Sequence, residues 1–218
     1  MGDAVPDHAP SSFEDNNAAV YVVDDDRPQC EAMSDLLSSV GLRSKLFATA
    51  NAFLQADLQD APCCLLLDVR LPGMSGLEFQ EHLRQLGNQV PIVFVTGFAD
   101  VPMSVRAMKG GAVDFLTKPV RDQDLLDSVY RAIEADRYAR ARRFSFEQLC
   151  QHYSELTGRE KEVMALVSSG LMNKQIAGRL GVSDVTVKIH RGQVMRKMGA
   201  RSVADLVRMM DRISSKET

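Results

Sequence analysis

Cys64-Leu65-Leu66-Leu67-Asp68-Val69-Arg70-Leu71-Pro72-Gly73 is the stretch that decides the fold class of this chain. Its apolar run is short, as expected for a buried strand, and the Pro-Gly pair that follows predicts a turn. Asp68 would then end the strand and place one carboxylate at the exposed edge of a sheet.

Three other apolar runs end in polar residues in the same way. Val20–Val23 leads into Asp24-Asp25-Asp26, Ile92–Val95 into Thr96-Gly97, and Ala112–Leu116 into Thr117-Lys118-Pro119. Amphipathic helical patterns separate these runs, and the alternation is typical of a parallel α/β sheet. Together with a short strand at Ser44–Phe47, it predicts a flavodoxin-like (βα)5 domain. The helices are expected at Pro28–Val40, Ala50–Ala56, Gly76–Leu86, Val101–Lys109 and from near Arg121.

The charge of the chain is divided unevenly along its length. Residues 1–150 carry 14 Lys and Arg against 22 Asp and Glu, whereas residues 151–218 carry 12 against 7. The first segment therefore has a net charge of −8 and the second of +5. This asymmetry indicates that only the C-terminal part approaches a polyanion.

Composition and cysteine usage predict a protein of a reducing cytoplasm. No apolar stretch approaches the roughly 20 residues that span a bilayer, and the N-terminus has no signal-peptide pattern. Residues 1–17 are polar and acidic and are expected to form a disordered leader. The four cysteines have neither disulfide-framework nor zinc-site spacing.

The polar residues at the strand ends predict a phosphoryl-accepting site. Ligands of open α/β sheets bind beyond the carboxyl ends of the strands. Asp24 and Asp25 would face Asp68 there, while Asp26 is either oriented away or caps the following helix. Such carboxylates suit Mg²⁺ or Mn²⁺. Lys118 supplies a positive charge and Thr96 a hydroxyl, so Asp68 is predicted to form an aspartyl-phosphate.

Other interpretations of this acidic site are weaker. Helix capping by the aspartates does not explain why Thr96 and Lys118 end neighbouring strands. A dinucleotide site requires a Gly-rich turn after the first strand, which is absent from the sequence. A phosphatase of the haloacid-dehalogenase type has a second acid two residues after the first, where this chain has Arg70.

Residues 18–135 resemble the receiver domain of two-component response regulators. The resemblance rests on Asp24-Asp25, on Asp68 with Leu71–Gly76, on Thr96-Gly97 and on Phe115–Pro119. It implies that Asp68 is the phospho-acceptor and that Asp25, Asp68 and the Arg70 carbonyl bind Mg²⁺, with Asp24 acting through water. Thr96 would be the switch hydroxyl, and Phe115 either the aromatic that rotates inward or an ordinary core residue. The Lys118-Pro119 bond would be cis.

The C-terminal segment shows helical patterns only. Thr157 with Glu160 forms a capping box for a helix reaching about Ser169. Asn173 is expected to cap Lys174–Leu180, and Ser183 a helix that reaches Lys197. Ser202 with Asp205 caps a fourth. The second and third helices, joined by Gly181-Val182, are typical of a helix-turn-helix that places one helix in the DNA major groove.

Basic side chains on the third helix are candidate DNA contacts. Lys188 and Arg191 are three residues apart, whereas Arg196 and Lys197 are placed for phosphates. Each could instead belong to a solvated helix face. Leu156–Met210 resembles the LuxR-type DNA-binding domain through Leu156–Glu160, Asn173–Ala177 and Val185–His190. Its combination with a receiver is that of the NarL/FixJ family, and Asn173–Ala177 with Val194–Met198 looks most like the FixJ branch. The DNA-binding residues that this implies are Lys174, Thr186, Lys188, Ile189, Arg191, Arg196 and Lys197.

One residue of the third helix departs from the family pattern. Gly192 stands where relatives often carry a bulkier polar or basic residue, and it costs about 0.5–1 kcal/mol of helix propensity against Ala. The operator sequence therefore cannot be taken from a relative.

The sequence predicts a phosphorylation-controlled transcription factor and not an enzyme, apart from its own phosphoryl transfer and dephosphorylation. A sensor histidine kinase, double-stranded promoter DNA and a second copy of the phosphorylated chain are the expected partners, and no membrane. The alternatives are a phosphorylation-independent DNA-binding protein and a phosphotransfer enzyme with a docking domain. The expected parts are a leader (1–17), a receiver domain (18–135), a helical linker (136–153) and a DNA-binding domain (154–218).

Overall fold

The computed structural model of the chain describes residues 17–215. Contacts divide the chain into two compact units, one ending at Arg140 and the other beginning at Ala141. The predicted leader lies outside the described residues except for Asn17. Within the described range, no helix combines the length and the apolar character needed to cross a membrane.

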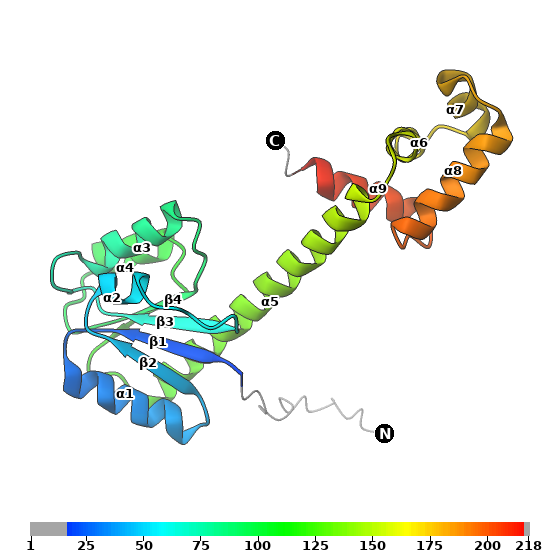
Figure 1. Cartoon of the computed structure of the whole chain (residues 1–218). Helices are drawn as coiled ribbons and strands as arrows, with labels where there is room; N and C mark the ends of the chain where they lie inside the picture. The colour runs from blue at the N-terminus through cyan, green and yellow to red at the C-terminus, as the bar shows by residue number, and fades with distance from the viewer. Residues whose placement is uncertain (1–16, 216–218) are drawn as a thin grey trace, which may run out of the picture. The chain divides into compact units, whose positions relative to one another are not determined.

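The N-terminal unit is built on a five-stranded parallel sheet with the order β2-β1-β3-β4-β5 (Figure 1). The central strands are buried along their whole length, as their apolar runs predict. The order reverses between β1 and β3, so polar residues after these two strands meet at one edge. The strands are β1 (Ala19–Val23), β2 (Arg43–Phe47), β3 (Cys63–Leu67), β4 (Ile92–Thr96) and β5 (Asp114–Thr117).

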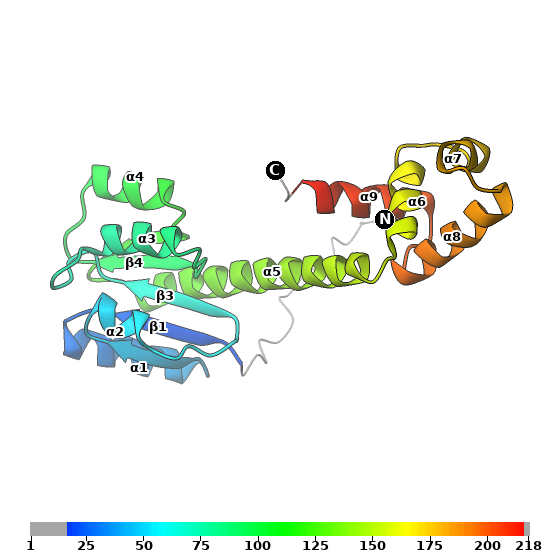
Figure 2. The same ribbon diagram turned by 45° about the horizontal axis from the view of Figure 1, so that its top comes forward.

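Helices cover both faces of this sheet, which confirms the flavodoxin-like fold (Figure 2). One core cluster joins α1 and α5 to the sheet through side chains such as Leu37 and Val129. A second, on the other face, joins α2, α3 and α4 through Phe53, Phe79 and Ala107. The helices are α1 (Arg27–Ser39), α2 (Ala50–Leu54), α3 (Gly76–Gln85), α4 (Val101–Lys109) and α5 (Asp122–Ser154).

The helix α5 is continuous through the segment that was predicted as a helical linker. Its first part is held to the sheet by a buried carboxylate. Asp136, 3% exposed, accepts hydrogen bonds from the backbone N–H of Cys63 at 2.9 Å and from Nε of Arg140 at 2.7 Å. Arg140 also contacts Asp60, at 2.5 Å. This network fixes the helix to the beginning of β3, the strand that Asp68 follows.

The C-terminal unit is helical and has its own core around Val163, Ile176, Val187 and Leu206. The predicted caps Thr157, Ser183 and Ser202 are present. Gly181 ends the second helix with a φ of 65°, a left-handed conformation that favours glycine. The helices are α6 (Gly158–Ser168), α7 (Asn173–Leu180), α8 (Asp184–Lys197) and α9 (Val203–Ser214).

The prediction that Asn173 caps α7 is wrong. Met172 occupies the N-cap position, and Asn173 is the first helical residue. The side-chain oxygen of Asn173 accepts a hydrogen bond from Nη1 of Arg191 at 2.9 Å instead. A charged donor competes well against backbone N–H groups for such an oxygen.

Candidate functional site

Three carboxylates meet at the carboxyl end of the sheet. Asp24 and Asp25 directly follow β1, and Asp68 follows β3. One oxygen of each lies within 4.8 Å of the others. The backbone supports this arrangement, because the N–H of Asp68 donates to the carbonyl of Val23 at 3.0 Å and holds the two strand ends together.

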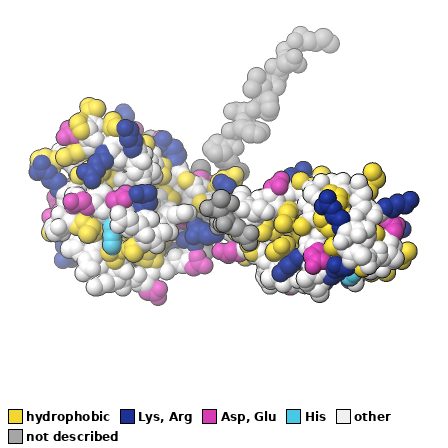
Figure 3. All heavy atoms as spheres, turned by 90° about the horizontal axis from the view of Figure 1, so that it is seen from above, with side chains coloured by type: hydrophobic (Ala, Val, Ile, Leu, Met, Phe, Trp, Pro, Cys, Tyr) yellow, Lys and Arg dark blue, Asp and Glu magenta, His cyan; other side chains and the backbone are white. Residues whose placement is uncertain are grey.

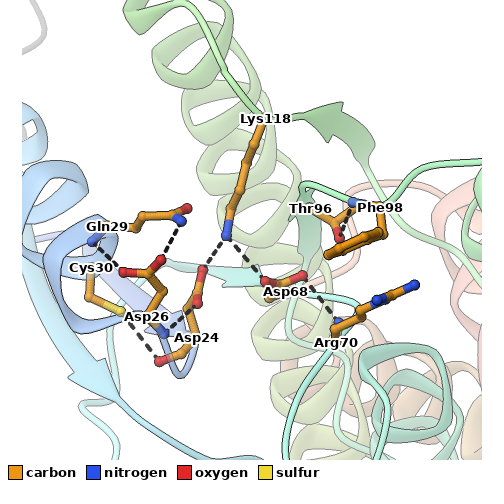
Figure 4. Close-up of polar contacts among 9 residues, drawn as sticks. All are labelled: Asp24, Asp26, Gln29, Cys30, Asp68, Arg70, Thr96, Phe98 and Lys118. Carbon is orange, nitrogen blue, oxygen red and sulfur yellow. Dashed lines mark hydrogen bonds and ion pairs between the residues drawn. The ribbon is translucent and has the colours of Figure 1, made fainter.

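Lys118 extends from the loop after β5 and points between two of these carboxylates (Figure 4). Its Nζ lies 2.6 Å from Oδ2 of Asp24 and 3.1 Å from Oδ2 of Asp68. The backbone N–H of Lys118 donates to the carbonyl of Thr96 at 2.9 Å, which fixes the start of its side chain. The Lys118-Pro119 bond is cis, as predicted.

Burial and neighbouring charges shift the pKa values of Asp24 and Lys118. Removal from water raises the pKa of the Asp24 carboxyl, and the hydrogen bond from Lys118 only partly opposes this effect. Lys118 also loses hydration, which lowers its pKa, but the carboxylates of Asp24 and Asp68 outweigh this and leave the pKa raised. Lys118 therefore stays charged beside Asp68.

The donor set fits a hard divalent cation. Three carboxyl groups face a single ammonium group, so the described residues of the site have an excess of acidic oxygens. Asp24 is buried, Asp25 exposed and Asp68 intermediate, which leaves one side open to water. Mg²⁺ prefers one or two carboxylates and keeps several of its waters.

Asp68 is partly buried, and both of its carboxylate oxygens accept hydrogen bonds. Its side chain is 11% exposed, and its two oxygens accept from the backbone N–H of Arg70 at 3.1 Å and from Lys118. The beginning of α3 approaches its backbone so closely that a Cβ at Gly76 would lie 2.2 Å from the Asp68 carbonyl oxygen. Only glycine fits at position 76.

Thr96 is the last residue of β4, and Phe115 lies within the neighbouring strand β5. Thr96 is fully buried, and its hydroxyl accepts the backbone N–H of Phe98 at 3.3 Å. Phe115 is partly buried against Phe94, with ring centroids 5.8 Å apart. Among the described residues, the hydrogen-bond donors to the Asp68 carboxylate are the Arg70 backbone and Lys118, and neither Thr96 nor Phe115 is one of them.

One feature beside the site was not anticipated from the sequence. The guanidinium carbon of Arg70 lies 3.4 Å from the ring centroid of Phe98, a cation–π contact (Figure 4). Arg70 comes two residues after Asp68, and Phe98 two residues after Thr96. No motif predicts the contact, because it depends on the conformations of two exposed side chains.

The predicted DNA contacts fall into two groups. The side chains of Lys174, Lys188, Ile189 and Arg196 are exposed. The other three, which are partly buried, have partners within the unit. Thr186 bonds the hydroxyl of Ser183 at 2.8 Å, Arg191 bonds Asn173, and Nζ of Lys197 lies 2.7 Å from Oε2 of Glu160.

Comparison with known proteins shows the family. Residues 20–130 match the response regulator receiver domain, and residues 154–210 match bacterial regulatory proteins of the luxR family. The chain therefore belongs to the NarL/FixJ family of two-component response regulators, which join a receiver domain to a LuxR-type DNA-binding domain.

Individual relatives cover nearly the whole chain. Nodulation protein W of Bradyrhizobium diazoefficiens is 52% identical over 89% of this chain and 86% of its own length. The low-resolution structure of the response regulator StyR is 45% identical, with a TM-score of 0.81 over 90% of this chain and 99% of its own. Full-length FixJ from B. japonicum is 37% identical, with a TM-score of 0.54 over 90% and 97%.

Proposed function

We propose that Asp68 is the phospho-acceptor of this response regulator and that a sensor histidine kinase is the donor. The observation that carries the proposal is the placement of Asp68 within 4.8 Å of two further carboxylates and 3.1 Å from Lys118. A carboxylate oxygen can act as the nucleophile that forms an aspartyl-phosphate, and the Lys118 ammonium group lies beside it.

The transfer is a substitution at phosphorus. A carboxylate oxygen of Asp68 attacks the phosphorus of the phosphohistidine, the new O–P bond forms, and the P–N bond breaks with its electron pair going to the imidazole nitrogen. Lys118 offsets the negative charge that develops on the phosphoryl oxygens. Asp25, Asp68 and the carbonyl of Arg70 would hold Mg²⁺, with Asp24 acting through water. The bound ion would supply further positive charge to the same oxygens.

Phosphorylation would then change the surface of the receiver domain. It adds a charge of about −1.5 to −2 at pH 7, which draws the Thr96 hydroxyl and Lys118 toward the phosphoryl group. Phe115 turns into the space that Thr96 leaves, and α4 shifts. Three apolar side chains of α4 support dimerisation through this face, since Val101, Val105 and Met108 are 75%, 45% and 47% exposed.

The output is control of transcription through a dimer bound to paired half-sites about one helical turn apart. We infer that residues 18–135 form the receiver domain, 136–153 the helical linker and 154–218 the DNA-binding domain. The protein acts in the bacterial cytoplasm, where both its kinase and its promoter DNA are accessible to it. Its only chemistry is its own phosphoryl transfer and dephosphorylation.

The experiment that tests this function measures phosphate-stimulated DNA binding. Full-length protein is incubated with a small acyl phosphate and Mg²⁺, and its affinity for promoter DNA is compared with that of the untreated protein over a range of salt concentrations. We expect treatment to increase affinity for the wild type and for Asp35→Asn, an exposed acid of α1, but not for Asp68→Asn. Binding should weaken steeply with salt, because counterion release is characteristic of nucleic acid. An Asp68→Asn variant that responds like the wild type would contradict the proposal.

A further inference from the structure

The outward surface of α8 is apolar along its centre. Val185 is 67% exposed and Ile189 57%, and a spacing of four residues puts them on the same side of the helix. Gly192, seven residues after Val185, continues this line. The opposite side carries Val187 and Val194, which are fully buried in the core of the unit.

These exposed side chains do not serve the packing of the unit. Val185 and Ile189 are absent from the described core cluster, including its partly buried members. Both are β-branched, which lowers helix propensity, and each leaves apolar surface in contact with water. Their presence is explained if a partner covers this surface.

Gly192 has no packing role in the unit either. A Cβ added there would meet no atom within 4 Å, and the residue is in ordinary helical conformation. The domain would thus accommodate alanine, which is the better helix former. Because Gly192 has no side chain, a partner could approach the backbone of α8 more closely at this position.

Charge identifies the kind of partner. Lys188 and Arg196 are exposed on the same side of α8, and the segment 151–218 has 12 basic against 7 acidic residues. In the space-filling view, basic and hydrophobic side chains lie next to one another on this unit (Figure 3). The matching surface is a polyanion that also presents apolar groups. The major groove of duplex DNA does so wherever thymine exposes its C5-methyl group.

We propose that Val185 and Ile189 contact thymine methyl groups in the major groove, and that Gly192 allows the α8 backbone to approach the bases closely. The proposal rests on the proposed function, because it requires this unit to bind duplex DNA. Residues four apart are separated by about 6 Å along a helix, and base pairs by about 3.4 Å. Each half-site should therefore contain two thymines within about two base-pair steps.

The test replaces thymine by uracil, which removes the methyl group and leaves every hydrogen-bonding group of the base in place. A preferred site is first selected from random duplexes with the full-length, acyl-phosphate-treated protein. Each thymine is then replaced singly. At two positions of the half-site we expect about fourfold weaker binding, as the loss of one buried methyl-sized group predicts. At the remaining positions uracil should leave the affinity unchanged.

Variants connect each methyl group to a side chain. Val185→Ala and Ile189→Ala should each remove the uracil effect at one position, whereas Leu86→Ala, an exposed residue of the N-terminal unit, should keep both. Gly192→Ala should raise the melting temperature of the C-terminal unit and yet weaken binding to the selected site at least about fivefold. A residue that acted only on folding would move both quantities in the same direction.

Three results would overturn the proposal. The first is a selected site in which uracil has no effect at any position although binding is specific and salt-dependent. The second is an uracil effect that survives in both alanine variants. The third is loss of self-association in those variants with DNA affinity retained, which would assign the surface to a second copy of the chain. Failure to bind any duplex would instead contradict the proposed function itself.

Discussion

At the scale of single residues, Lys118 is a positive charge that interacts with the same carboxylates that a divalent cation would bind. Its ammonium group is 2.6 Å from Asp24 and 3.1 Å from Asp68. Lys118→Met should therefore bind Mg²⁺ at least about tenfold more tightly, because a nearby positive charge is removed. The same variant should take up phosphate about a hundredfold more slowly, because the developing charge loses a stabilising group.

Calorimetric titration with Mg²⁺ and the rate of modification by an acyl phosphate measure these two effects. Lys109→Met, which removes an exposed lysine at the end of α4, is the matched control and should change neither. Unchanged or weaker Mg²⁺ binding by Lys118→Met would contradict the electrostatic account of the site.

Asp24 makes stability depend on pH in a defined direction. Burial raises its pKa, so the folded state binds this proton more tightly than the unfolded state. A carboxyl with a raised folded-state pKa stabilises the fold when protonated, and this contribution is lost as the pH rises through that value. The Asp24→Asn variant has no carboxyl at this position, so its stability does not decrease with pH for this reason. In Mg²⁺-free buffer, its free energy of unfolding relative to wild type should therefore increase as the pH rises from the ordinary aspartate value of 3.8 to neutrality.

Urea unfolding of both proteins across this range gives the difference directly. A difference that is constant, or that decreases with pH, would show that ionised Asp24 carries no net cost in the folded protein.

Residues of the site differ in how far the sequence could place them. Asp68, Asp24 and Lys118 were found because each directly follows a predicted strand, and parallel strands bring their carboxyl ends to one edge. The contact between Arg70 and Phe98 could not be found, because it depends on side-chain conformation and not on strand position. The same holds for the Asn173–Arg191 hydrogen bond, which overrode a capping preference that is only local.

At the scale of secondary-structure elements, two adjacent basic residues near the end of α8 have different environments. Lys197 pairs with Glu160, whose side chain is 4% exposed, whereas Arg196 is exposed. Lys197→Met should lower the free energy of unfolding by about 1–3 kcal/mol, since the buried carboxylate loses its charged partner. Arg196→Met should change stability by less than about 0.5 kcal/mol and reduce the salt dependence of DNA binding by about one phosphate contact.

Thermal unfolding followed by circular dichroism and DNA titrations at several salt concentrations separate the two roles. The reverse pattern, with Arg196→Met destabilising and Lys197→Met altering only the salt dependence, would refute this assignment. The prediction that Lys197 contacts a phosphate remains open to the same titrations.

Most elements were predictable because their signals are local. The strands β1, β3 and β4 follow from apolar runs, and the helix starts at Thr157 and Ser202 follow from capping boxes that the structure contains. The network that fixes α5 was not predicted. Asp136 and Cys63 are 73 residues apart, and sequence periodicity carries no information on such a pair.

At the scale of the whole molecule, dimerisation should depend on the apolar side chains of α4. Val105→Asp places a charge among Val101 and Met108, and burying that charge at an interface would be costly. We expect the phosphorylated variant to remain monomeric in analytical ultracentrifugation while the wild type dimerises. Leu86→Asp, an exposed apolar position outside α4, should dimerise normally. A dimeric Val105→Asp variant would exclude this face as the interface.

The covalent state of Asp68 tests the central claim most directly. Intact-mass spectrometry of the full-length protein after incubation with an acyl phosphate, with and without Mg²⁺, reports how many phosphoryl groups are bound. We predict one phosphoryl group on the wild type in the presence of Mg²⁺ and none on Asp68→Asn. A wild-type protein that stays unmodified with Mg²⁺ present, or an Asp68→Asn variant that gains the same mass, would contradict the account.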